Sequence, residues 1–377
     1  MLRWGAAGAR GSAAALMVGA LVAGCSTSGT VGGGEPSPGP ASGSGTTSPA
    51  PPTDRSLASG TQGPPTTSAS SASSASSASS ADVTVTPGEA AAELKAYQGQ
   101  NNAANAALDT AAIAKVEGGS LLALDQASLV YVQGVGGDQA KKAAVPMSLD
   151  DPQFLIPPAP SYPRGFFVTA QAVQSGSPNT SFLMHFTQDH AGAPWRADSD
   201  VFLTPGQQWP SFAVGANGLL DYSATQLAKL PLQTTDLVAA DRTMLADDNP
   251  GQPGSPFLTD DSTTAELRWI QNETDDVSPA SVAMTVTTEL NLAPTYLPLK
   301  DGGELVLYGT RVALRVTQSG RSFTFGDQGW AKLAGTDTVT GGFTADAVWM
   351  VAAIDPPDKG AKVQKIAYNG GLVSVQH

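Results

Sequence analysis

The chain has 377 residues, of which 20 are Lys or Arg and 33 are Asp or Glu, so its net charge is −13. Because no basic excess is present to neutralise phosphates, the composition argues against a nucleic-acid-binding protein. A single cysteine excludes both an intramolecular disulfide framework and a metal site built from several cysteines.

The first residues have the pattern of a secretory signal. Arg3 and Arg10 precede an apolar stretch over residues 13–23, which is too short to span a hydrocarbon core of ~30 Å as a helix. The stretch ends in Leu21-Val22-Ala23-Gly24-Cys25, which resembles the lipobox of bacterial lipoproteins. This resemblance implies that residues 1–24 are a lipoprotein signal peptide and that Cys25 is acylated. An ordinary secretory signal followed by an unrelated cysteine is the alternative.

The next segment, residues 25–81, consists almost wholly of Ser, Gly, Pro, Thr and Ala. Such a composition cannot bury enough apolar surface to offset its conformational entropy, so we predict a disordered tether that begins at the lipidated cysteine. A flexible chain of this length reaches roughly 40 Å. Together, the signal and the tether predict localisation to the extracytoplasmic face of the cell membrane.

We predict a first folded unit over residues 82–230. Thr86-Pro87-Gly88-Glu89 is a capping box with proline in the first turn, and a helix is expected to continue to Ala107. Two shorter helical pieces follow, ending near Gly118 and near Gly134. After a proline-rich loop, the apolar period changes from 3.6 to 2. This change predicts three antiparallel strands over residues 165–173, 181–187 and 195–203.

The second unit, residues 231–377, repeats this order. A helix is predicted from Thr234 to just before Asn249-Pro250-Gly251, and four strands follow it. These strands are expected over residues 281–290, 304–316, 346–354 and 362–375. The predicted fold class is therefore α+β, with two consecutive units that each have N-terminal helices packed on a curved antiparallel sheet.

Each half resembles, in its element order, the cone of nuclear-transport-factor-like proteins. The whole chain also resembles a family of lipoproteins of unknown function from high-GC Gram-positive bacteria. The residues that carry this second resemblance, besides the lipobox and the tether, are Asn101-Asn102-Ala103-Ala104-Asn105, Tyr162-Pro163-Arg164-Gly165-Phe166-Phe167 and Pro194-Trp195-Arg196. It implies no activity, cofactor or catalytic residue.

The motifs of common catalytic and metal sites are not found in the sequence. No histidine pair has the spacing of a helical zinc site, and the folded part has no Gly-x-Ser-x-Gly motif. We expect His185, in the middle of a strand, to be a half-buried packing residue. Asp198 with Asp200, or Asp247-Asp248-Asn249, are candidate calcium ligands, although turn formation is the favoured interpretation. No catalytic, cofactor-binding or metal-binding residue is predicted.

One candidate pocket involves two arginines. Arg311 and Arg315 share the strand face opposite Val312 and Leu314. With tryptophans nearby, the pair is suited to an anionic or sugar ligand. In the alternative interpretation, the tryptophans fill the core and the arginines face water.

Three functional hypotheses remain open. The first is a membrane-anchored, non-catalytic module that binds a cell-wall component or an envelope protein, with the bilayer as its partner through acylated Cys25. The second is a carboxylate-based hydrolase of wall glycan, which requires two facing carboxylates in a deep cleft. The third is a solute-capture lipoprotein. The helix-first, antiparallel order argues against the alternating βα lobes of that class.

Overall fold

The computed structural model describes residues 84–377 apart from 248, 250, 252, 277–279 and 290, together with residues 3 and 4. Cys25, the tether and nearly all of the predicted signal peptide lie outside the described residues. Residues 3 and 4 form a short strand, β1 (Arg3–Trp4), which pairs in parallel with the end of β8 (Glu304–Phe325).

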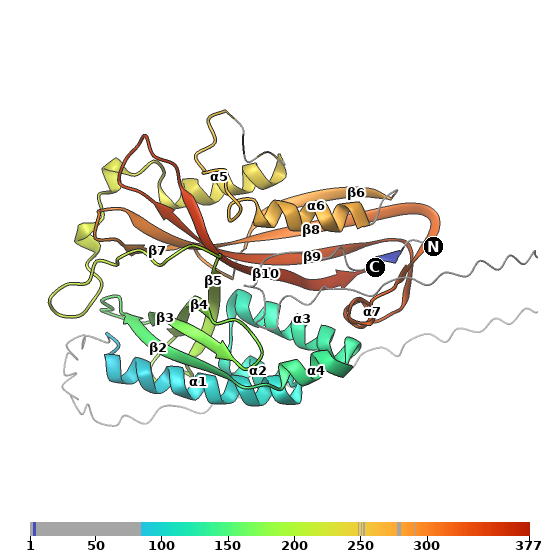
Figure 1. The fold of residues 1–377 in the computed structure, drawn as a ribbon, viewed down its shortest axis with the longest axis horizontal. Coiled ribbons are helices and arrows are strands. Elements are labelled where there is room, and N and C mark those ends of the chain that lie inside the picture. The colour runs from blue at the N-terminus through green and yellow to red at the C-terminus, as the bar shows by residue number, and fades with distance from the viewer. Residues whose placement is uncertain are drawn as a thin grey trace, which may run out of the picture. The chain divides into compact units, whose positions relative to one another are not determined.

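Four helices open the continuous part of the structure; the first three pack against strands that follow them, and the fourth packs against the first and third (Figure 1). They are α1 (Pro87–Ala107), α2 (Thr110–Val116), α3 (Gly119–Val135) and α4 (Gly137–Ala143). The predicted cap is present, because the Thr86 hydroxyl accepts a hydrogen bond from the Glu89 backbone N–H at 3.1 Å. Sequence analysis did not predict α4: Gly136 and Gly137 have positive φ and reverse the chain, and a helix then resumes.

The strands of the first half form an antiparallel meander of β2 (Met147–Leu155), β3 (Arg164–Gln174), β4 (Thr180–Gln188) and β5 (Arg196–Leu203). The last three match the predicted strands. β2 was not predicted, because Pro152 and two aspartates interrupt its apolar pattern. These residues lie in an irregularity of the β2–β3 pairing between Asp150 and Gln153, which a strand tolerates at a sheet edge.

The second half contains three helices and five strands among the described residues, and two short 3₁₀ turns precede it. The helices are α5 (Thr234–Ala246), α6 (Ala265–Asp276) and α7 (Gln328–Ala334), and the two 3₁₀ turns, η1 (Tyr222–Ala224) and η2 (Leu227–Lys229), lie in the connection that leads into this half. The strands are β6 (Ser281–Thr288), β7 (Thr295–Pro298), β8, β9 (Thr338–Asp355) and β10 (Gln364–Gln376). β8 and β9 are longer than predicted, and α6, α7 and β7 were not predicted.

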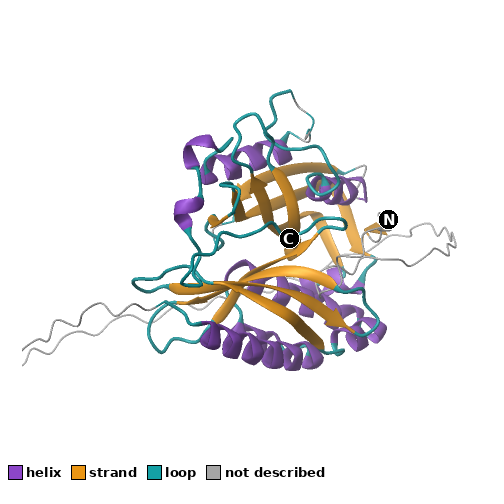
Figure 2. Cartoon of the chain, turned by 60° about the vertical axis from the view of Figure 1, so that its left-hand side comes forward, coloured by secondary structure: helices purple, strands orange, loops and turns teal. Residues whose placement is uncertain are grey.

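One sheet joins the two halves in the order β2-β3-β4-β5-β10-β9-β8, and both β6 and β7 pair with β8. The join is short, because β5 and β10 pair only at Leu203 with Ala367 and at Phe202 with Tyr368. Every pairing between the named strands except that of β1 is antiparallel, and the sheet is strongly curved (Figure 2). The predicted α+β class with helices on a curved antiparallel sheet is thus confirmed. The division at residue 230 stays a prediction.

Side chains that alternate along β8 divide the interior into two cores. Leu305 and Leu307 belong to a core shared with α1 and β2–β5, whereas Val306 and Tyr308 belong to one shared with α5 and α6. Because neighbouring strand residues point to opposite faces, this part of the sheet is covered on both sides. Each core encloses a group of ionisable side chains.

Candidate functional site

Two groups of buried ionisable residues lie where the helices meet the sheet. The first, here called the acidic cluster, consists of Glu117, Asp125 and Asp200. The second, here called the lysine cluster, consists of Asp241, Glu266 and Lys365. None of the six residues is more than 9% exposed.

The acidic cluster joins the first helices to the sheet. Tyr97 and Asn101 on α1 both donate hydrogen bonds to Glu117 Oε1, each at 2.9 Å. Asn369 on β10 donates to Asp200 Oδ1 at 2.6 Å. Glu117 and Asp125 are also hydrogen-bond partners, and no ion pair is formed between the cluster and a lysine or arginine of the described chain.

These carboxyls hold their protons to unusually high pH. Burial, reinforced by the Asp125 charge, raises the pKa of Glu117 well above its ordinary value. Burial and the neighbouring Asp200 raise the pKa of Asp125 to about 7, and burial raises that of Asp200 to about 6, against the opposing hydrogen bond from Asn369. Because no lysine or arginine of the described residues pairs with these carboxyls, desolvation favours their neutral forms.

The lysine cluster joins α5, α6, β8 and β10. Lys365 Nζ lies 2.6 Å from Asp241 Oδ1 and also contacts Glu266 Oε2. The Tyr308 hydroxyl donates to Asp241 Oδ2 at 2.9 Å, and the Thr310 hydroxyl donates to Glu266 Oε1 at 3.1 Å. One amine therefore bridges two carboxyls, each of which has a hydroxyl donor of its own.

In this cluster, attraction between opposite charges counteracts the effect of burial on the pKa values. Burial alone would lower the pKa of Lys365, but the carboxylates of Asp241 and Glu266 outweigh it and raise that pKa. The pKa of Glu266 is raised by burial, and Lys365 counteracts part of the increase. Two carboxyls share one amine, so the cluster has one acidic group in excess.

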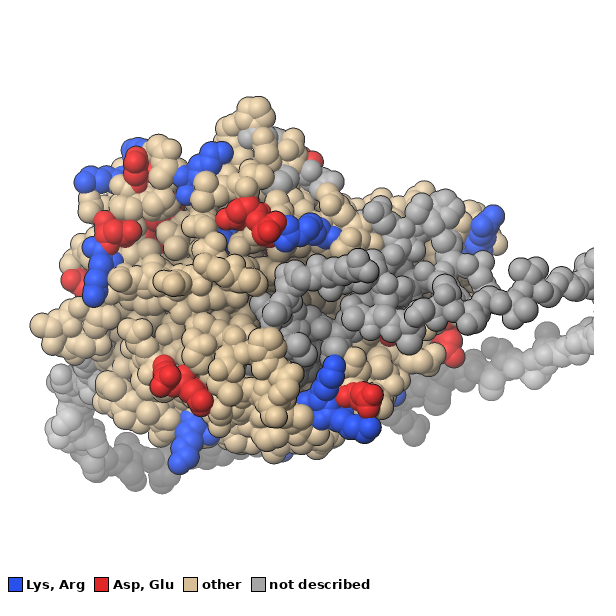
Figure 3. All heavy atoms as spheres, in the orientation of Figure 1, with Lys and Arg blue, Asp and Glu red and all other residues tan. Residues whose placement is uncertain are grey.

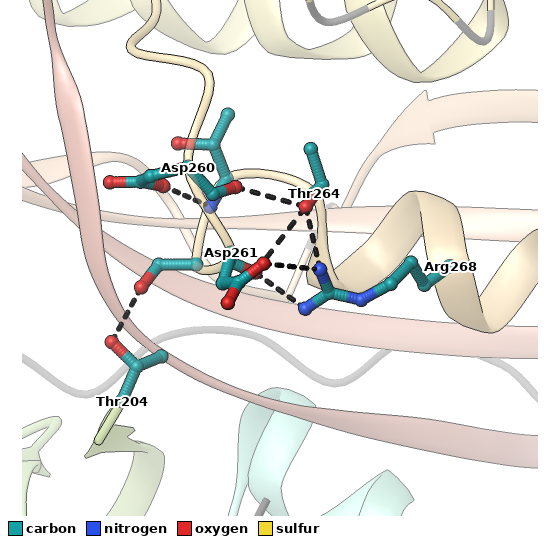
Figure 4. Close-up of polar contacts among 7 residues, drawn as sticks. Thr204, Asp260, Asp261, Thr264 and Arg268 are labelled. Carbon is teal, nitrogen blue, oxygen red and sulfur yellow. Dashed lines mark hydrogen bonds and ion pairs between the residues drawn. The ribbon is translucent and has the colours of Figure 1, made fainter. Parts of the chain in front are cut away.

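A tightly bonded loop before α6 positions Glu266. Asp260 Oδ1 accepts from the Thr263 N–H at 2.8 Å, and Arg268 Nη1 donates to both Asp261 Oδ1 and the Thr264 hydroxyl (Figure 4). The Ser262 hydroxyl lies 2.6 Å from that of Thr204, which follows β5. The loop is thereby fixed to the sheet, and α6 starts with Glu266 in its first turn.

A further acidic pair, Glu304 and Asp355, lies directly across the β8–β9 pairing, and both residues are fully buried. Burial raises the pKa of Glu304 to about 7 and that of Asp355 to about 6. The Thr234 hydroxyl at the start of α5 donates to Glu304 Oε1 at 3.0 Å. This pair therefore anchors the beginning of α5 to the sheet.

The arginines of the candidate pocket have different surroundings. Arg311 Nε donates to Glu289 Oε2 at 3.0 Å, whereas Arg315 is exposed beside an open depression of about 490 Å³ that also includes His377. Val312 and Leu314 belong to the core that holds Trp269 and Trp349. The tryptophans thus lie on the face opposite the arginines, and the proposed pocket stays a prediction.

The histidine and calcium candidates do not converge on one site. His185 is half-buried, stacks on Phe167 and pairs through Nδ1 with Asp198 Oδ1 at 2.9 Å, in agreement with a packing role. Asp200 instead belongs to the acidic cluster. Asp248 lies outside the described residues. Within the described part of the chain, no group of three His, Cys, Asp or Glu residues is arranged to hold a metal ion.

The two edges of the antiparallel sheet differ in their protection. At β2, the Asn102 side chain on α1 bonds both the N–H and the C=O of Met147, and Gln98 accepts from the Leu149 N–H. β6 has the sequence Ser-Val-Ala-Met-Thr-Val-Thr-Thr, without charge or proline. Among the described residues, its backbone forms ladder hydrogen bonds with β8 alone. Such an edge is free to pair with another strand.

The surface shows no segregation of charge on the face in Figure 3, where basic and acidic side chains lie close together between wide uncharged areas. Among the described helices, none is long and apolar enough to cross a membrane.

Comparison with known proteins places the chain in one family. Residues 81–377 match the model of the domain of unknown function DUF8094. The chain belongs to the DUF8094 family. No curated protein and no solved structure matches it. The domain begins where the predicted tether ends, so the tether is outside the matched region.

Sequence reasoning missed both ionisable clusters, because their members are far apart along the chain. One signal was present at the start of β10, where Lys365 lies among the apolar residues Val363, Ile366 and Ala367, each at most 1% exposed. A lysine among buried apolar residues requires a buried acidic partner. The sequence does not reveal which of the many carboxylates supplies it.

Proposed function

We propose that this DUF8094 protein is an extracytoplasmic lipoprotein, anchored by acylated Cys25, whose folded part is a non-catalytic module that binds an envelope protein. The lipobox-like Leu21–Cys25 segment and the Ser/Gly/Pro/Ala tether support the anchor. The observation that carries the binding role is the uncharged, open edge of β6.

Strand addition is the recognition mode that this edge favours. Ser281, Ala283, Thr285 and Thr287 form an exposed row, while Val282, Met284 and Val286 pack against the core. An extended segment of a partner protein would gain backbone hydrogen bonds from β6 and contacts with the row of small side chains. The protected edge at β2 offers no such backbone groups at Met147 and Leu149.

The other two hypotheses have weaker support. A glycan hydrolase needs carboxyls that substrate can reach, but the carboxyls whose pKa is raised to about 7, Asp125 and Glu304, are at most 9% exposed. A solute-capture protein of the usual kind has parallel strands in two βα lobes, whereas β2–β10 pair antiparallel.

Replacing the lipid attachment site tests the anchor. We expect Cys25→Ala to move the protein from the membrane fraction into the medium, because the thiol that carries the acyl chains is gone. A Ser28→Ala change in the tether is the matched control and should leave it in the membrane. Retention of Cys25→Ala in the membrane fraction would contradict the lipid anchor.

Site-specific photo-crosslinking in intact cells tests the binding role. A photoreactive amino acid at Thr285 should give one discrete adduct with an envelope protein, and the same residue at Gln153 on β2 should give none. Thr287→Lys introduces a charge on the exposed row and should reduce the Thr285 adduct without changing membrane localisation. Equal adducts at both edges, or an adduct insensitive to Thr287→Lys, would argue against strand addition at β6.

A further inference from the structure

The lysine cluster has the components of an amide-forming site. Lys365, Asp241 and Glu266 are each at most 2% exposed, and Lys365 Nζ lies 2.6 Å from Asp241 Oδ1 while also contacting Glu266. The amine and the Asp241 carboxyl are held in contact by α5 and β10. Fixed contact of this kind replaces a collision between two free groups and strongly accelerates reaction between them.

The surroundings favour condensation over a simple ion pair. The Phe257 ring centre is 5.7 Å from Nζ, and Leu237, Val238 and Tyr308 of the same core are buried. Burial of an ammonium and a carboxylate in an apolar core carries a large desolvation cost, whereas burial of a neutral amide does not. The Tyr308 hydroxyl donates to Asp241 Oδ2, where it can stabilise negative charge that develops on the carboxyl oxygen.

We propose that Lys365 Nζ and Asp241 Cγ are joined by an intramolecular isopeptide bond, and that Glu266 relays the protons. Glu266 takes a proton from the Lys365 ammonium, and the neutral amine attacks Asp241 Cγ to form the C–N bond. As the tetrahedral intermediate collapses, one C–O bond breaks. The departing oxygen receives two protons that both came from the ammonium and leaves as water. The balance is one ammonium and one carboxylate giving one amide and one water, with no oxidant or other reactant.

The position of the bond in the fold would make it a covalent cross-link between two distant parts of the chain. Asp241 lies on α5 and Lys365 on the last strand, so the link would close α6, β6–β9 and α7 into one covalent loop. A chain whose only cysteine is Cys25 has no internal disulfide to provide such a closure. The inference rests on the cluster alone and does not depend on the proposed function.

Peptide mapping of the full-length protein tests the bond directly. A modified Lys365 resists trypsin, so we expect residues 230–242 to be joined to residues 363–377, with a combined mass lower by one water than the sum of the two peptides. Fragmentation should place the link at Asp241 and Lys365. Separate, unmodified peptides from the folded wild-type protein would overturn the proposal.

Variants separate the roles of the residues and guard against a false water loss. Lys365→Arg and Asp241→Ala remove one of the two linked groups, so each protein should have the full mass of its sequence. Glu266→Gln should leave all or most molecules unlinked. Lys362→Arg, an exposed change in the same segment, should still show the loss of one water. Dehydration at Asp301-Gly302 also removes one water. A loss that persists in Lys365→Arg and maps to Asp301 would therefore refute the isopeptide bond.

Discussion

The acidic cluster and the lysine cluster both bury carboxyl groups, but they offset the cost of desolvation in different ways. Both are buried where helices meet the sheet, and in both a buried tyrosine donates to a carboxyl oxygen. The acidic cluster has no cation among the described residues, so its carboxyls stay neutral by keeping protons. In the lysine cluster, Lys365 supplies the opposite charge. The acidic cluster is therefore expected to respond to pH, as is the Glu304–Asp355 pair on β8 and β9, whereas the lysine cluster depends on one side chain.

Removal of the lysine is expected to have the largest effect on stability. Relative to the unlinked form of the chain, in which Lys365 and Asp241 are an ion pair, Lys365→Met leaves Asp241 and Glu266 buried without their shared cation. We expect the free energy of unfolding to fall by about 3–5 kcal/mol, as for other broken buried ion pairs. Urea denaturation of the purified protein measures the change. Lys362→Met, an exposed change in the same segment, should have little effect. Equal stability of the two variants would show that Lys365 contributes no more than a surface lysine.

The next largest effect is the pH dependence of the acidic cluster. The pKa values of Asp125 and Asp200 are about 7 and about 6 in the folded protein, against about 3.9 in an unfolded chain. The folded state therefore binds more protons between about pH 4 and pH 7, and its stability falls as the pH rises through this window. We expect Asp125 alone to account for a loss on the order of 3 kcal/mol.

The Asp125→Asn variant provides the check on that assignment. It removes the titrating proton but keeps an uncharged polar group, so the curve of unfolding free energy against pH should become flatter. At pH 8 the stability of the variant relative to the wild type should therefore be higher than at pH 5. Asp189→Asn, at an exposed position, should leave the curve unchanged. An unaltered slope in Asp125→Asn would place the titration elsewhere.

The two buried tyrosines allow a smaller, matched test. In the unlinked form of the chain, Tyr308→Phe removes the hydroxyl that donates to the charged carboxylate of Asp241 at Oδ2 and should cost about 2 kcal/mol. Tyr97→Phe should cost about 1 kcal/mol, because Asn101 still donates to Glu117 Oε1. Denaturant midpoints of the two variants measure the difference. A larger cost for Tyr97→Phe would mean that Glu117 is the more highly charged of the two carboxyls.

The parts of the fold that sequence analysis predicted correctly depend on local signals. The Thr86 cap and the alternation in β3 and β4 act within a few residues, and the structure confirms them. β2 was missed because its apolar pattern is broken by a bulge, and α6 because its apolar stripe is short. The clusters were missed for a different reason: Asp241, Glu266 and Lys365 come together only through tertiary packing.

The smallest expected effects come from two aspartates outside the clusters that start the elements leading to them. Asp109 accepts from the N–H groups of Ala111 and Ala112 and begins the helix that ends beside Glu117, while Asp260 accepts from the Thr263 N–H just before α6 and Glu266. Each Asp→Ala change should lower stability by about 1 kcal/mol, because a backbone N–H loses its cap. Thermal denaturation at pH 5 and pH 8 compares them with Asp189→Ala. If local caps only position the clusters, the losses are equal at both pH values; a loss at Asp109 that changed with pH would instead tie the start of α2 to the protonation of Glu117.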